Sequence, residues 1–133
     1  MLHLHLSVYS GADSPQWHVQ LGSVPFHEQI GLSNLTHTDI TCDLNELRRT
    51  IRAGGIFRLF TCCCGSVACK AFHVEVTHTG DELVWNRVFA DEDGSVGKSM
   101  MKVNWRFKRV EYEQTVQRAI EITEFTTHNQ HYV

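Results

Sequence analysis

Alternation between apolar and polar residues predicts a hairpin at the start of the chain. Residues 2–8 alternate leucine or valine with polar side chains, and residues 17–21 repeat the alternation after the turn-forming stretch 11–15. A period of two is typical of strands with one buried face, so we expect two antiparallel strands here. Residues 22–41 show no regular pattern and contain Pro25 among several breakers, which predicts a long connection with at most one short turn of structure.

Two segments have the spacing of helices instead. Asp43, with Glu46 three residues later, is typical of an N-cap with a capping box, and glycines at 54–55 are expected to end that helix. Residues 112–123 carry apolar side chains along one side and glutamates and glutamines on the other, which predicts a second helix. We expect the remaining residues, 126–133, to fray.

The middle of the chain predicts the centre of a sheet. Residues 56–62 are apolar or aromatic on both alternating faces, and residues 72–76 and 83–89 flank a turn as a second hairpin. Residues 101–107 alternate with basic side chains, so we expect one buried and one basic face. The order is close to ββαββββα, which favours an α+β fold with a mostly antiparallel sheet of about six strands and two helices on one face.

Length and composition are those of one globular domain. The chain has 133 residues and a mass of 15.2 kDa, with 42% hydrophobic and 20% charged residues, so we expect a single domain over residues 1–133. No apolar run approaches the roughly 18 residues that span a bilayer, and the start of the chain alternates instead of forming a signal-peptide core. We therefore expect a cytoplasmic protein with no membrane partner.

The charge balance favours a basic protein partner over nucleic acid. The net charge is −3, and no broad basic surface for a polyanion is evident from the sequence. Exposed carboxylates can steer a basic partner and exclude wrong ones, although solubility alone also explains such residues. The candidate partner-binding carboxylates are Asp81, Glu82, Asp91, Glu92, Asp93, Glu113 and Glu121.

The common catalytic motifs do not occur in this sequence. It has no Walker loop, dinucleotide-binding glycine fingerprint, G-x-S-x-G elbow or H-E-x-x-H helix. We therefore expect a binding protein with no cofactor, not an enzyme.

The cysteines are the densest chemical feature. Five are present, an odd number, and four of them lie within eight positions: Cys42 stands apart from Cys62, Cys63, Cys64 and Cys69. Secreted disulfide scaffolds usually have an even number of dispersed cysteines, so reduced thiols are expected.

The chemistry of the cysteine cluster has several alternatives. A zinc site would draw on Cys62, Cys64, Cys69 and His78, but zinc sites usually pair two cysteine knuckles and only one is present. A disulfide between Cys64 and Cys69, a thiol enzyme with a depressed pKa, and buried free thiols are the other possibilities. Buried free thiols are the expectation that cysteine's usual burial favours.

The histidines supply two weaker candidate metal sites. His3 and His5 point the same way on the first strand, and His128 and His131 lie three residues apart near the end. No adjoining carboxylate completes either site, so we expect His3 and His5 to lie on a solvated strand face.

The cysteine-rich strand also carries a resemblance. The run Phe60-Thr61-Cys62-Cys63-Cys64-Gly65, with Cys69 after it, matches F-T-C-x-C-G-x-x-x-C, and residues 74–78 match V-x-V-x-H. Residues 84–86 stand where the pattern has a V-x-W strand. This half of the chain resembles a group of small bacterial proteins, with Cys63 and residues 70–71 departing from their pattern.

Proteins of this size and organisation are similar to immunity proteins of bacterial polymorphic toxins, including those of contact-dependent growth inhibition systems. The resemblance implies a protein that binds the C-terminal domain of its cognate toxin and blocks the active site or substrate access. Combined with the negative charge, it predicts a basic, nuclease-like toxin as the partner. The alternative hypothesis is a cysteine-based zinc-binding or redox-responsive module.

Overall fold

A computed structural model describes residues 1–9, 16–31, 40–62 and 71–130. Within these ranges the chain forms eight strands and three helices. The elements are β1 (Leu4–Tyr9), β2 (Gln16–Leu21), β3 (Val24–Pro25), α1 (Phe26–Gln29), β4 (Ile40–Cys42), α2 (Leu44–Arg52), β5 (Gly55–Cys62), β6 (Phe72–Thr79), β7 (Glu82–Glu92), β8 (Ser95–Lys108) and α3 (Arg109–Gln130).

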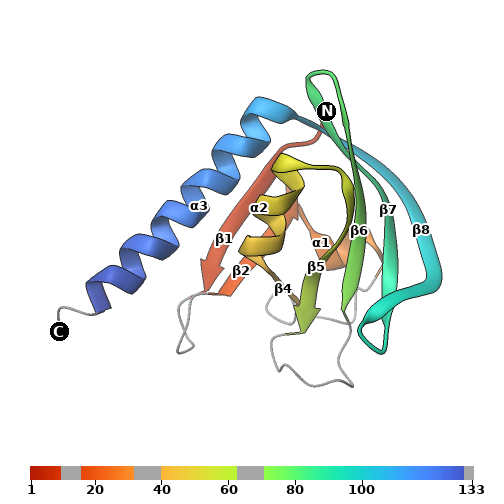
Figure 1. The fold of residues 1–133 in the computed structure, drawn as a ribbon, viewed down its shortest axis with the longest axis horizontal. Helices are drawn as coiled ribbons and strands as arrows, with labels where there is room; N and C mark the ends of the chain where they lie inside the picture. The colour runs from red at the N-terminus through yellow and green to blue at the C-terminus, as the bar shows by residue number, and fades with distance from the viewer. Residues whose placement is uncertain (10–15, 32–39, 63–70, 131–133) are drawn as a thin grey trace.

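The strands form one curved sheet in the order β1-β2-β4-β5-β6-β7-β8, with β3 paired to β2. All of these pairings are antiparallel, and β5 lies at the centre of the order, as predicted. The two ends of the sheet meet at one point, where the Leu2 N–H donates to the Arg106 carbonyl oxygen at 2.9 Å. Figure 1 shows how β1 and β8 converge there beside the start of α3.

The α+β class and the mostly antiparallel sheet are confirmed, but the prediction of about six strands and two helices is wrong. The additional elements are β3, α1 and β4, which fall largely in the stretch expected to be a connection. β3 has two residues and β4 three, so neither is long enough to show a period of two. Their pairing with β2 and β5 is a tertiary effect that local pattern does not encode.

The helix α2 begins where the sequence predicts, with a different set of hydrogen bonds. The Asp43 carboxylate accepts from the backbone N–H groups of Asn45 and Glu46, so the N-cap is confirmed. The predicted capping box is wrong, because the Asp43 N–H donates to the Leu59 carbonyl oxygen and Glu46 pairs with Arg49 instead. This N-cap therefore ties α2 to the central strand β5.

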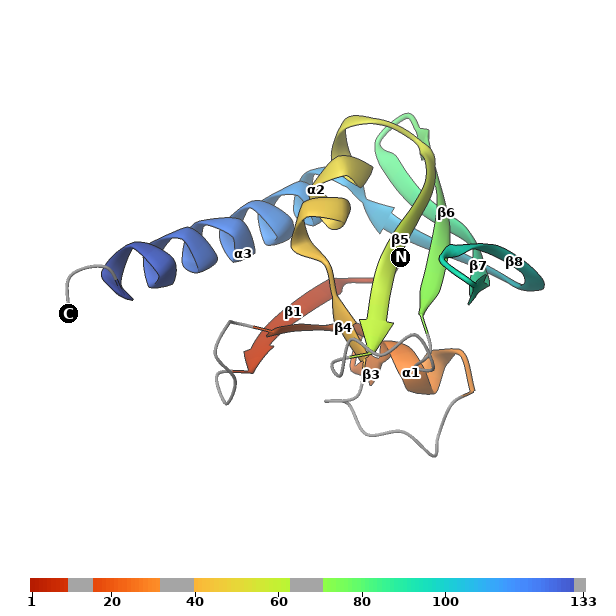
Figure 2. The ribbon, with the colours of Figure 1, turned by 60° about the horizontal axis from the view of Figure 1, so that its bottom comes forward.

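The helix α3 follows β8 directly and packs its first half against β1 and α2. Its backbone is helical as far as Gln130, and residues 131–133 of the tail expected to fray lie outside the described residues. The indole N–H of Trp17 donates to the Thr123 hydroxyl at 2.9 Å and attaches the helix to β2. Figure 2 shows the last turns of α3 extending away from the sheet, and Phe125 is 68% exposed there.

Aromatic side chains fill the space enclosed by the curved sheet. Phe26 of α1 stacks on Phe60 of β5 with ring centroids 3.7 Å apart. Trp85 of β7 contacts Phe60, Phe107 and Tyr112, each edge to face. All three helices contribute to this one core, because Leu47 of α2 belongs to the same cluster.

The apolar face of β8 is buried at only one end. Phe107 is 1% exposed, whereas Met101, six residues earlier on the same alternating face, is 43% exposed. The predicted buried face over residues 101–107 is therefore confirmed at Phe107 and wrong at Met101, which borders an open cavity.

No helix among the described residues is long and apolar enough to cross a membrane.

Candidate functional site

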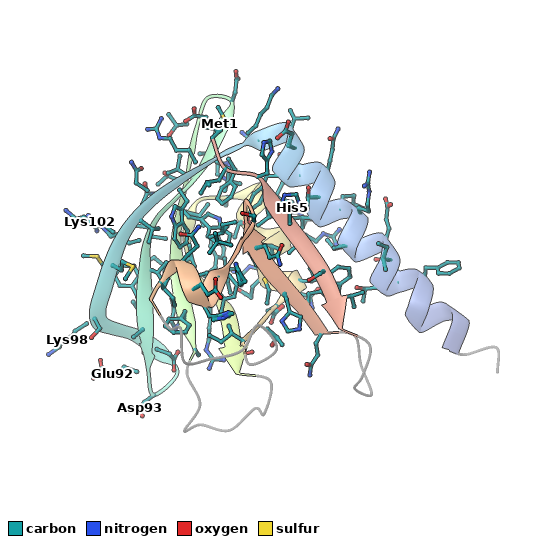
Figure 3. The ribbon with its side chains drawn as sticks, turned by 180° about the vertical axis from the view of Figure 1, so that it is seen from behind. Met1, His5, Glu92, Asp93, Lys98 and Lys102 are labelled. Carbon is teal, nitrogen blue, oxygen red and sulfur yellow. The ribbon has the colours of Figure 1, made fainter. Side chains whose placement is uncertain are left out.

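The hairpin between β7 and β8 ends in an acidic tip. Glu92 pairs with Ser95, and the two residues between them, Asp93 and Gly94, both have positive φ values of 54° and 88°. Two such residues form a type I′ turn, for which Asp-Gly is a preferred sequence. Glu92 and Asp93 are exposed, and Figure 3 shows them at the tip, directed away from the fold.

The tip is held from behind by Asp91. Its Oδ2 accepts from the Gly94 N–H at 3.0 Å, and its own N–H donates to the Ala71 carbonyl oxygen at 3.0 Å. Its Oδ1 lies 2.7 Å from His73 Nε2 and 3.2 Å from Arg58 Nε. One carboxylate therefore joins the turn to three adjacent strands, β5, β6 and β7.

Asp91 is ionised at neutral pH. Burial acts to raise its pKa, but hydrogen bonds from His73, from the Gly94 N–H and from Arg58, together with the Arg58 charge, outweigh it and hold the pKa below its ordinary value. Because a carboxylate only accepts hydrogen bonds, His73 Nε2 carries the proton that it shares with Asp91. This arrangement fixes the ring orientation of His73.

Register explains how Arg58 and His73 reach the same carboxylate. They face each other directly across β5 and β6, and Asp91 lies beyond the end of β6 on the neighbouring strand. No local sequence pattern connects these three residues. The Asp-Gly turn locates the hairpin tip, but the pairing of Arg58 with His73 follows only once the strand register is known.

The predicted partner-binding carboxylates fall into separate places. Asp81 and Glu82 lie at one end of β7, and Asp91, Glu92 and Asp93 lie at the other (Figure 1). An 11-residue strand separates them, a span of roughly 33 Å at about 3.3 Å per residue. The two groups cannot form one contact patch.

Several of these carboxylates are already engaged within the fold. Glu82 lies 3.0 Å from Arg106, and Glu113 on α3 lies 3.2 Å from Arg109. Glu121, two turns further along α3, accepts from Gln117 at 3.4 Å. Within the described residues, Glu92 and Asp93 take part in no ion pair, so the hairpin tip is where adjacent carboxylates are presented freely.

The structure describes little of the predicted cysteine site. Cys64, Cys69 and the Cys62 side chain lie outside the described residues, so the zinc and disulfide hypotheses stay predictions. His78 Nε2 lies 2.6 Å from the Thr50 carbonyl oxygen, so that nitrogen is occupied. Among the residues that the structure describes, no three His, Cys, Asp or Glu side chains are arranged to hold a metal.

His3, just before β1, and His5, on β1, line a cavity of about 270 Å³ between the start of the chain and α3. His3 Nδ1 is 3.2 Å from Glu111 Oε2, and His3 and His5 are both exposed, so the exposure to solvent expected for this pair is confirmed. His5 and Arg118 line the same cavity. Sequence reasoning missed Glu111 because it arrives from a helix more than 100 positions away, which no local pattern indicates.

The hairpin tip is thus a rigid, negatively charged projection suited to contact with a cationic surface. A turn held by Asp91 loses little conformational freedom on binding, so more of the interaction energy appears as affinity. In comparisons with known proteins, no protein-family model, curated protein or solved structure matches the chain.

Proposed function

We propose that the protein is an immunity protein that binds the C-terminal domain of a cognate bacterial toxin in the cytoplasm and blocks its active site or substrate access. The toxin domain is basic and nuclease-like, since the surface offered to it is acidic. The observation that carries this proposal is the β7–β8 tip, where Glu92 and Asp93 are exposed, unpaired among the described residues and fixed in place by Asp91. The resemblance of the cysteine-rich strand supports the same function.

Placement of the two carboxylates suits inhibition. A narrow hairpin tip can enter a concave, cationic active site that otherwise receives phosphates, and complementary charge raises the rate of encounter. The contacts of Asp91 with His73 and Arg58 attach the tip to the neighbouring strands and hold its conformation when it enters the toxin's active site. No chemistry by this chain is required.

Co-expression with a toxin domain encoded immediately upstream tests the proposal. The wild-type chain should restore growth and co-purify with the toxin. Glu92→Gln with Asp93→Asn keeps the turn, because asparagine tolerates positive φ, and should slow association about tenfold at low ionic strength. Association is measured by stopped-flow fluorescence at several salt concentrations.

A matched control removes the same amount of charge elsewhere. Asp81→Asn with Glu121→Gln changes two exposed carboxylates remote from the tip and should leave association close to wild type. If both double variants slow association equally, net charge and not the hairpin governs binding. If the wild-type chain neither binds nor protects, the immunity function is wrong.

A further inference from the structure

The outer edge of β8 is unpaired along most of the strand, among the residues that the structure describes. Along Ser95–Trp105, β7 is the only strand paired with β8 in the part of the chain that the structure describes. The amino-terminal segment reaches β8 only at its far end, through Leu2 and Arg106. Figures 1 and 2 both place β8 at the rim of the sheet. Within the described residues, backbone N–H and C=O groups on its outer side therefore meet no other strand over most of a 14-residue strand, whose register against β7 shifts between Val96 and Met100.

Unpaired positive charge lies along this edge. Lys98 and Lys102 are exposed, and neither is in an ion pair within the described ranges. Figure 3 shows both side chains projecting outward from β8. Arg106, by contrast, is held by Glu82 at 3.0 Å, so its charge is already balanced. The charge available to a partner is concentrated where the edge is open.

Apolar surface accompanies the two lysines. Met100 and Met101 lie between them and are 44% and 43% exposed, although methionine is usually buried. Both border an open cavity of about 220 Å³, whose lining is apolar apart from Ser99: Ile30, Phe72, Val88, Ala90, Ser99, Met100 and Met101. The cavity lies against the face of the sheet that carries Val88 and Met101, which pair directly.

We propose that β8 accepts an extended segment of a partner protein as an additional strand, and that this segment alternates acidic with apolar residues. Backbone hydrogen bonds to the free edge of β8 supply the register, and alternate side chains supply specificity. Acidic residues on one face of the segment meet Lys98 and Lys102, and apolar residues on the other contact Met101 and fill the cavity. This surface has the opposite charge to the acidic tip and does not depend on the toxin-binding role proposed for that tip.

Repulsion between like charges disfavours a second copy of this chain as the partner that pairs with the edge of β8. Two copies paired through this edge would bring four lysines together, and an antiparallel register centred on Met100 would set Lys98 of one copy directly opposite Lys102 of the other. Like charges directly opposite each other destabilise a strand pair. Lysines on a free edge are a common protection against self-association, and an acidic strand is the kind of partner that they still admit.

Fluorescence anisotropy with a labelled peptide, Glu-Val-Glu-Leu-Glu-Val-Glu, tests the proposal on the full chain. We expect saturable binding that weakens about tenfold in the Lys98→Gln, Lys102→Gln double variant. The same peptide with alternate backbone amides N-methylated keeps its charge but loses the edge hydrogen bonds, so it should not bind. The matched control, Lys108→Gln with Arg118→Gln, removes the same charge away from the open edge and should bind like wild type.

Three results would overturn the proposal. One is the absence of saturable binding by the unmodified peptide. Another is equal binding of the N-methylated peptide, which would mean attraction without strand addition. The third is sedimentation of the chain as a dimer that the Lys98→Gln, Lys102→Gln variant strengthens, which would assign the edge to a second copy.

Discussion

The hydroxyl of Tyr112, on α3, lies 2.8 Å from the hydroxyl of Thr50, on α2. Trp85 Nε1, 3.3 Å away, can only donate, so the Tyr112 oxygen accepts from it. Thr50 gives its own proton to the Leu47 carbonyl oxygen, so the proton of Tyr112 points to Thr50. Burial raises the pKa of Tyr112 well above its ordinary value and keeps this donor protonated. One directed chain of hydrogen bonds thus joins β7, α3 and α2.

Tyr112→Phe should lower the free energy of unfolding by about 1–3 kcal/mol, because it leaves Trp85 without an acceptor and Thr50 without a donor inside the core. Urea unfolding followed by tryptophan fluorescence measures the change. A double-mutant cycle with Thr50→Val is the control, and Tyr112→Phe should cost less in that background. Strict additivity of the two changes would contradict the chain of hydrogen bonds.

Asp91 should make stability depend on pH in the acid range. Its folded pKa lies below the ordinary value of about 3.9, so the stabilisation is fully present above the ordinary value. It is lost as pH falls through the lower, folded value, because protonation removes the Asp91 charge that pairs with Arg58 and weakens the hydrogen bonds that the carboxylate accepts from His73 and Gly94. Asp91→Asn keeps an acceptor oxygen but not the charge. It should lower the free energy of unfolding at neutral pH and reduce the fall of that free energy with decreasing pH, which we call the acid limb.

Urea midpoints measured between about pH 2 and 7 test the prediction for Asp91. Asp93→Asn, two positions along and exposed, is the control and should keep the acid limb of the wild type. An Asp91→Asn variant with an unchanged limb would show that another carboxylate governs it.

Gly97→Ala should destabilise the β7–β8 hairpin. A Cβ at this position would lie against the Ala90 carbonyl oxygen, far inside van der Waals contact, and neither backbone can move without disturbing the register between the strands. We expect a loss of roughly 1–3 kcal/mol in the free energy of unfolding. Lys98→Ala, exposed and adjacent, should change it by less than about 0.5 kcal/mol. Similar effects of the two substitutions would contradict the steric explanation.

Cys42 should behave as an inert thiol. It is buried in β4, and burial, together with the neighbouring Asp43 charge, raises its pKa far above the ordinary range, so almost no thiolate forms at neutral pH. Iodoacetamide treatment followed by peptide mass spectrometry should label Cys42 only after urea unfolding. Labelling of Cys42 at similar rates in folded and unfolded chains would contradict this placement.

The elements with strong local patterns were predictable from sequence. The strand at residues 2–8, the central strand and the last helix each carry a clear period, and Asp43 carries the N-cap chemistry that begins α2. The elements that the sequence did not reveal are short or depend on contacts between strands. For example, β3 and β4 are recognisable only through their pairing with β2 and β5. The capping box was predicted wrongly for the same reason, since the carbonyl oxygen of Leu59, distant in sequence, accepts from the Asp43 N–H.

The candidate site was predictable in composition but not in geometry. The sequence identifies seven candidate carboxylates. Their charge is the same, so it does not tell which of them are free to contact a partner. Structure separates Glu92 and Asp93, which are displayed, from Asp91, which holds the turn, and from Glu82, which balances Arg106. Such roles depend on strand register, because a shift of one residue would move Asp91 to the opposite face of the sheet.

The bond between Trp17 and Thr123 has a consequence for how the chain matures during synthesis. Its two partners are 106 residues apart, and the backbone contact between Leu2 and Arg106 spans a similar length. The first hairpin therefore leaves the ribosome long before the strand and helix that complete it. Until α3 has been made, β1 and β2 lack the helix that packs against them, and we expect the nascent chain to be open to aggregation or chaperone binding at this hairpin.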